Sequence, residues 1–231
     1  MNIEALITSV DDPQLDRCLE AVRTQTVPFS NIIHMNKVCP QCVSFNNGMR
    51  QTTEEWVMLI GGDMILHKDA AERITKYMEQ DSNDKISGYY FGLYDTFLDC
   101  KIGYISVLRG SLYRKTPLED NIITDWQSIR RLRKAGWIDR KLFYFQAGTH
   151  FDFPDEFQVF KRFYIHGIRF RDGRSAIGRL SGLLEKTGNP LYHLGIQAIE
   201  YAWSKKSYPG SHNYDFDKKN FEEFRELNGY S

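Results

Sequence analysis

The chain has 231 residues, of which 42% are hydrophobic and 26% are charged, and its 30 Lys and Arg residues balance 30 Asp and Glu residues. This composition excludes an intrinsically disordered chain, which has fewer hydrophobic residues and a larger net charge. A net charge of zero also argues against a nucleic-acid partner, because such partners are held mainly by basic surfaces. At this length the chain can bury a core without a disulfide or metal staple.

The amino-terminal segment has no secretory signal, which predicts a cytoplasmic protein. Residues 1–12, MNIEALITSVDD, hold a short apolar run between acidic residues, whereas a signal peptide has a basic start and a longer apolar core. The apolar run at 56–60 is far shorter than the roughly 18 residues of a membrane-spanning helix. Cys39 and Cys42 have CxxC spacing, but no second ligand pair lies nearby, so a zinc or redox site is a minor alternative.

Strand and helix patterns alternate through the first part of the chain. We expect strands at 5–10, 32–35 and 56–60, and helices after an Asp12–Pro13 cap, at 46–53 and at 69–80. In the first helix, Leu15, Cys18, Leu19 and Val22 recur at helical spacing. The strand at 56–60 is apolar throughout, as a strand buried on both faces should be. This rhythm is typical of a parallel α/β sheet.

From residue 86 the pattern becomes β-rich and then helical. We expect strands at 89–94, 102–108 and 138–145, a helix from Thr124 to Ala135 with Gly136 in a left-handed C′ position, and helices at 191–205 and 218–227. Ten aromatic residues lie between Phe143 and Phe170, interleaved with basic ones. They form either a packed core or a surface that stacks on sugars or contacts a membrane. We expect one domain over 1–174 and a helical extension over 175–231 packed on it.

Polar residues follow the first three predicted strands. Thr8, Ser9 and Asp11 follow the first strand, Asn36 the second, and Asp63 the third. In an open parallel sheet, ligands bind beyond the carboxyl ends of the strands, so these residues are candidate ligand contacts. Asp63 comes after two glycines, and its carboxylate suits a hard divalent cation while the backbone can approach a phosphate. The alternative is a turn residue or a helix cap.

Several motifs occur in a fixed order between residues 3 and 140. They are Gln25-Thr26 after the first helix, Asn46-Asn47-Gly48, Gly61-Gly62-Asp63 after a buried strand, and Asp125 eleven residues before Gly136 with Arg131-Leu132-Arg133 between them. In order and spacing the chain resembles the family 2 glycosyltransferases of the nucleotide-diphospho-sugar transferase superfamily. The resemblance implies the GT-A fold, an α/β fold with a mixed, mostly parallel sheet flanked by helices. It also implies a nucleotide-binding half over 1–85 and an acceptor-binding half over 86–174.

The resemblance further implies an inverting transfer from a nucleotide-diphosphate sugar to a hydroxyl of a glycan or lipid-linked acceptor. Asp125 would be the base, and Asp63 and His150 would bind Mn²⁺ or Mg²⁺. Donor contacts would come from Thr8, Ser9, Asp11, Asn36, Asn46, Gly62 and Asp63. Such a protein would have no nucleic-acid partner, and peripheral contact with a membrane stays open. If Asp125 is not the base, Glu119 or Asp120, an acidic pair just before the same helix, would take that role.

Three positions depart from the family pattern and keep two alternatives open. Gly61 replaces the first Asp of the metal motif, Asn36 lies where an acidic residue contacts the nucleotide, and Thr124 replaces a Glu. The chain is therefore either an enzyme or a binding module that kept the fold and lost the reaction. A nucleotidyltransferase ranks third, because residues 8–14 contain neither the glycine nor the basic residue that its phosphate loop needs.

Overall fold

The computed structural model describes residues 1–121, 124–150, 154–170, 174–205, 208, 210 and 213–228, without the side chains of Tyr104, Thr124 and Asp125. The chain forms two compact units. Met1–Asp120 with Thr124–Asp152 make up the first unit, and Asn121–Ile123 with Phe153–Ser231 make up the second. The division into units falls near residue 152, because the helix α6 (Glu156–Arg169) packs with helices of the second unit.

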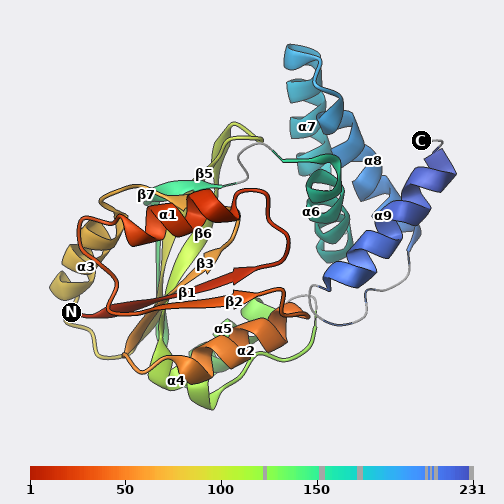
Figure 1. Cartoon of the computed structure of the whole chain (residues 1–231). Helices are drawn as coiled ribbons and strands as arrows, with labels where there is room; N and C mark the ends of the chain where they lie inside the picture. The colour runs from red at the N-terminus through yellow and green to blue at the C-terminus, as the bar shows by residue number, and fades with distance from the viewer. Residues whose placement is uncertain are drawn as a thin grey trace. The chain divides into compact units, whose positions relative to one another are not determined.

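The first unit is built on a sheet of seven strands, counted over the described residues, in the order β2-β1-β3-β6-β5-β7-β4 (Figure 1). The strands are β1 (Ile3–Ser9), β2 (Ile32–Asn36), β3 (Trp56–Gly61), β4 (Met64–Leu66), β5 (Ile86–Asp95), β6 (Cys100–Arg109) and β7 (Ile138–His150). β1 is parallel to β2 and β3, and β7 is parallel to β5, whereas β6 and β4 are antiparallel to their neighbours. Five strands thus share one direction, which confirms a mixed, mostly parallel sheet.

Helices cover both faces of this sheet (Figure 1). In the described part of the first unit they are α1 (Leu15–Arg23), α2 (Gln41–Gln51), α3 (Ala70–Gln80), α4 (Gly110–Lys115) and α5 (Thr124–Lys134). Successive side chains of a strand point to opposite faces. This alternation is visible in β1, where Ala5 and Ile7 pack with α1 and α3, while Leu6 packs with α2, α4 and α5.

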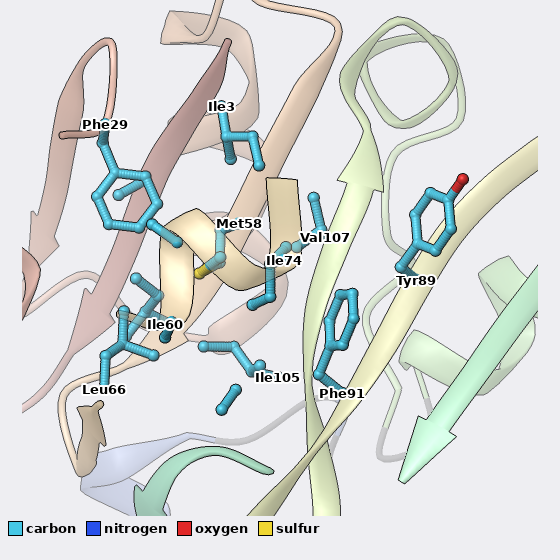
Figure 2. Close-up of a cluster of buried hydrophobic side chains, with 14 of the residues drawn as sticks. Ile3, Phe29, Met58, Ile60, Leu66, Ile74, Tyr89, Phe91, Ile105 and Val107 are labelled. Atoms are coloured by element: carbon cyan, nitrogen blue, oxygen red, sulfur yellow. The ribbon is translucent and has the colours of Figure 1, made fainter. Parts of the chain in front are cut away.

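The core on the α1 and α3 face is continuous across the sheet. Figure 2 shows Ile74 of α3 beside Met58 of β3 and Val107 of β6, and all three side chains are fully buried. Phe91 of β5 extends this cluster toward β7, where its ring lies 5.0 Å from that of Phe145. Burial of such side chains stabilises the fold by about 1.5–3 kcal/mol each. This face therefore anchors the strands whose ends carry the candidate site.

Most of the predicted elements of the first unit are confirmed, but two helix starts are wrong. α1 begins at Leu15, because Asp12 does not cap it and instead accepts a hydrogen bond from the backbone N–H of Val10 at 3.1 Å. α2 begins at Gln41, five residues before the expected start at Asn46. The short elements β4 and α4 were not expected.

Gly136 ends α5 as predicted. Its φ is +85°, in the region that favours glycine. Its N–H donates to the carbonyl of Arg133, and the N–H of Trp137 donates to that of Leu132, both at 3.0 Å. This pair of bonds is the Schellman motif, which satisfies the last carbonyls of the helix.

The second unit is helical over the residues described. It contains α6, α7 (Arg174–Thr187), α8 (Pro190–Ser204) and α9 (Tyr214–Asn228). The ring of Phe160 lies 5.4 Å from that of Tyr164 and 5.0 Å from that of Phe224, so much of the aromatic stretch is core. Phe143 and Tyr144 of β7, by contrast, are 43% and 71% exposed. None of the helices described combines the length and apolarity that crossing a bilayer requires.

Candidate functional site

The carboxyl ends of β1, β2 and β3 bring several of the predicted binding residues to one edge of the sheet. Thr8 pairs with Gly61, and Ser9 pairs with Asn36. The N–H of Gly62 donates to the carbonyl of Thr8 at 3.0 Å. The strand register therefore gathers these residues where ligands of such sheets bind.

The hydroxyl of Ser9 is committed to neighbouring side chains. Its oxygen lies 2.7 Å from Nε2 of His34 and donates to Oδ1 of Asn36 at 3.3 Å. Burial, followed by the charge of Arg23, lowers the pKa of His34, so the ring is neutral at pH 7. Because the Ser9 hydroxyl uses its proton to donate to Asn36, its oxygen can only accept from His34. The proton of the neutral His34 ring is therefore on Nε2, which donates to Ser9. A ligand at this edge therefore meets the exposed amide of Asn36.

Asp11 forms an exposed ion pair with Lys37 at 2.7 Å. Both residues have positive φ, +50° for Asp11 and +55° for Lys37, a conformation that non-glycine residues seldom adopt. An exposed ion pair stabilises a fold by at most about 1 kcal/mol. The pair nonetheless places one carboxylate and one ammonium group just beyond the ends of β1 and β2, within reach of a ligand that binds there.

Asn46 lies within α2 and holds a loop. Its amide nitrogen donates to the carbonyl of Leu118, and its amide oxygen accepts from the N–H of the same residue, both at 2.9 Å. Gly48, two residues on, allows α2 to approach β1, because a Cβ at this position would lie 2.2 Å from the side chain of Leu6. Asn46 thus fastens the segment that precedes α5.

Asp63 and His150 lie side by side although they are far apart in the sequence. Oδ2 of Asp63 is 3.2 Å from Nε2 of His150. Met64, which follows Asp63, pairs with His150 in the antiparallel register of β4 and β7. Their side chains are 26% and 15% exposed, so both groups are accessible to a ligand. The structure therefore joins the two residues that we expected to bind a metal.

A third residue, Asp95, completes this group and was missed from the sequence. Its Oδ2 lies 3.0 Å from Nδ1 of His150, and its side chain is fully buried. Asp95 ends β5 and pairs with His150 in the parallel register of β5 and β7. The same rule that selects Asp63, a carboxylate at the end of a buried strand, would have selected it.

Negative charge is concentrated around the two glycines of the motif. A Cβ on Gly62 would lie 2.6 Å from Oδ2 of Asp12. The thiol of Cys18 donates to the carbonyl of Gly61 at 3.5 Å. Burial, and then the carboxylates of Asp63 and Asp12, raise the pKa of Cys18 to about 12. The carboxylates of Asp63 and Asp12 thus both lie close enough to raise the pKa of the same thiol. Two negative charges in one place favour a cation at this edge of the sheet.

The catalytic candidate Asp125 lies in the first turn of α5, but its side chain is outside the described part of the structure, as is that of Thr124. The fallback acids are engaged elsewhere. Glu119 accepts from Arg131 at 2.7 Å, and Asp120 accepts from the thiol of Cys42 at 3.6 Å.

A pocket of about 190 Å³ opens beside Gly61, on the face covered by α2, α4 and α5. Apolar side chains form most of its wall, among them Phe45, Leu59 and Ile129. The hydroxyl-bearing residues Thr8 and Ser106 also line it. A mostly apolar pocket with a few polar groups is the usual form of a small-molecule site.

The donor atoms of Asp63 and His150 fit two adjacent positions on a divalent cation. Adjacent ligands of an octahedral ion with bonds of about 2.1 Å lie about 3 Å apart, close to the 3.2 Å between Oδ2 and Nε2. A carboxylate with a neutral imidazole suits Mn²⁺ better than Mg²⁺. Among the residues described, no group of three or more His, Cys, Asp or Glu side chains is arranged to hold a metal. Asp63 and His150 are thus a pair of adjacent donor atoms, and no third one joins them among these residues.

Comparison with solved structures decides the fold. The chain superposes on the mannosyltransferase PcManGT from Pyrobaculum calidifontis, in complex with GDP-Man and Mn²⁺, with a TM-score of 0.57 and 8% identity over 90% of this chain and 76% of that one. It superposes on S. aureus TarS 1-349 with a TM-score of 0.51 and 8% identity, covering 87% and 71% of the two chains.

The chain has the GT-A fold. No protein-family model and no curated protein sequence matches it. Identities of 8% carry no residue roles from one protein to the other, so the comparison shows the fold and does not assign a site or its chemistry.

Proposed function

We propose that the protein transfers a sugar from a nucleotide-diphosphate donor to a hydroxyl of a glycan or lipid-linked acceptor, with inversion at the anomeric carbon. The observation that supports this most is the Asp63–His150 pair, 3.2 Å apart at the carboxyl edge of a GT-A sheet. The donor would lie along this edge. Its contacts would be Thr8, Asp11, Asn36, Gly62 and Asp63, with Ser9 orienting Asn36 and Asn46 holding the loop before α5.

In this reaction the acceptor oxygen attacks the anomeric carbon, and the bond from that carbon to the diphosphate oxygen breaks. Asp125 takes the proton of the attacking hydroxyl, and the diphosphate leaves with the bonding electrons. A divalent cation, when bound, supplies positive charge to the departing diphosphate. Asp63 and His150 would hold that cation and so fix the leaving group. The pocket beside Gly61 would receive part of the substrate close to α5.

The experiment is a screen of nucleotide-diphosphate sugars for nucleotide release with Mn²⁺, with Mg²⁺ and with EDTA. We expect release with one donor class, dependent on Mn²⁺, and abolished in Asp63→Asn. Asp125→Asn should lower kcat by 10²-fold or more, the usual contribution of a general base. Asp84→Asn, which changes an exposed carboxylate that has no proposed role, is the control and should keep the rate. Full activity in a folded Asp125→Asn protein would overturn the assignment of the base.

A second function, a binding module without catalysis, is favoured by one observation. Gly61 stands where the family motif has an acid, so the chain lacks one expected carboxylate. Calorimetric titration of the same donors, with and without Mn²⁺, separates the two functions. A donor that binds without metal dependence and is never hydrolysed or transferred would favour the module.

A further inference from the structure

His150 is held between two carboxylates that come from neighbouring parts of the sheet. Its Nδ1 lies 3.0 Å from Oδ2 of Asp95, and its Nε2 lies 3.2 Å from Oδ2 of Asp63. β7 runs between β5 and β4, so Asp95 approaches the ring from one side and Asp63 from the other. Each ring nitrogen therefore faces a different acid.

Asp95 is the fixed member of this group. Its side chain is fully buried, and its second oxygen, Oδ1, accepts from the N–H of Leu98 at 2.6 Å in the turn between β5 and β6. The N–H of Thr96 donates to the carbonyl of His150 at 3.2 Å, so the backbones are tied as well. Burial and the bond from Leu98 hold the Asp95 carboxylate in place beside the ring.

The turn alone does not require an acid at this position. One acceptor is enough to bind the N–H of Leu98, and a neutral Asn supplies one. Burying a carboxylate is costly unless both its oxygens find donors. The second oxygen of Asp95 is directed at His150, and this is the contact that a neutral side chain would not hold as firmly.

An ionised carboxylate only accepts hydrogen bonds, so Nδ1 of a neutral His150 must carry the proton. Nε2 then presents its lone pair to Asp63. Nε2 and Oδ2 of Asp63, 3.2 Å apart, would then repel each other unless a proton or a bound cation lies between them. We propose that Asp95 is a positioning residue, which fixes the tautomer and orientation of His150 so that Nε2 and Asp63 together form the cation site. The cation part of this inference rests on the proposed function, whereas the tautomer part does not.

The first test needs neither metal nor substrate. ¹⁵N NMR of the histidine rings in metal-free protein, at the alkaline end of the titration where His150 is neutral, identifies the protonated nitrogen. His150→Asn assigns the signal. We expect the proton on Nδ1. A proton on Nε2 would overturn the proposal, whether or not Asp95 variants fold.

The second test measures Mn²⁺ binding without nucleotide, by the loss of the free Mn²⁺ EPR signal. We expect Asp95→Asn to weaken binding by 10- to 100-fold, the usual effect of removing a partner of a histidine ligand. Asp99→Asn is the matched control, because Asp99 is an exposed acid in the same hairpin and its φ of +48° suits Asn. Binding by Asp95→Asn equal to that of the wild type would overturn the proposal.

The two tests separate this inference from the proposed function. If Asp95→Asn weakens Mn²⁺ binding but the wild type turns over no donor, the positioning role of Asp95 is supported and the proposed sugar transfer is contradicted. If the wild type releases nucleotide and Asp95→Asn binds Mn²⁺ normally, the proposed sugar transfer is supported and the positioning role of Asp95 is contradicted. A wild type that binds no Mn²⁺ would overturn the cation part of the proposal, and the NMR result would then decide the tautomer part alone.

Discussion

Oδ1 of Asp63 lies 2.6 Å from the point where a Cβ on Gly61 would stand. Glycine at position 61 therefore makes room for the conformation in which Asp63 reaches His150. An acid at position 61, as in the family motif, would need the same space. The glycine at position 61 and the Asp63–His150 contact are thus parts of one arrangement.

Gly61→Ala should weaken Mn²⁺ binding by roughly tenfold, because the new Cβ displaces Asp63 from His150 and misaligns one ligand. Gly61→Asp should not improve binding, for the same steric reason. EPR titration measures both. Gly178→Ala is the control, since a Cβ there meets no atom within 4 Å. Unchanged Mn²⁺ affinity in Gly61→Ala would show that Asp63 does not need this conformation.

Ser106→Phe should block the pocket beside Gly61. A space of about 190 Å³ exceeds the roughly 150 Å³ cavity that accommodates benzene, so a phenyl ring fits without overpacking the core. We expect the KM of the donor or of the acceptor to rise at least tenfold, while Mn²⁺ binding stays the same. Ser106→Ala, which removes only the hydroxyl, is the control. Steady-state kinetics identical to those of the wild type would exclude the pocket from the substrate site.

Features set by neighbouring residues could be predicted from the sequence. The run at 56–60 forms β3, the helical spacing of Ala71, Ile74 and Met78 buries one face of α3, and Gly136 takes its left-handed conformation. In each case the local pattern and the tertiary environment favour the same structure. The carboxyl-edge rule likewise placed Thr8, Ser9 and Asn36 together.

The pairing of Asp95 with His150 could not be predicted, because the two residues are 55 positions apart and meet only through the register of β5 and β7. Long-range register is not encoded in local periodicity. α6 was missed for another reason. Phe160, Phe163 and Tyr164 have helical spacing, but the aromatic stretch was interpreted only as a packed core or a binding surface, without a helix.

Asp217 makes the stability of the second unit depend on pH. Burial raises the pKa of this carboxyl to about 7, although the hydroxyl of Tyr208 donates to it at 2.7 Å. The folded state therefore holds the proton to a higher pH than the unfolded state. The stability that this proton contributes is complete below about pH 4 and is lost as the pH rises from about 4 to 7.

Asp217→Asn keeps an acceptor for Tyr208 and cannot ionise, so it should remove this loss. We expect equal unfolding free energies for variant and wild type near pH 4, and a gain on the order of 4 kcal/mol for the variant at pH 8. Urea unfolding at several pH values measures the difference. Asp215→Asn, at an exposed position of the same helix, should show no such pH dependence. A parallel pH profile for Asp217→Asn and the wild type would contradict the prediction.

Cys18 should be slow to react with thiol reagents at pH 8. Its pKa is raised to about 12, first by burial and then by Asp63 and Asp12, and only the thiolate is an effective nucleophile. Cys39 and Cys100 are partly exposed and should be labelled first by iodoacetamide. Asp63→Asn removes one cause but leaves burial, so Cys18 should stay slow in that variant. Timed labelling with peptide mass spectrometry measures each rate, and unfolded protein provides the fully reactive control. Labelling of native Cys18 as fast as that of Cys100 would mean that the thiol under Gly61 is open to solvent.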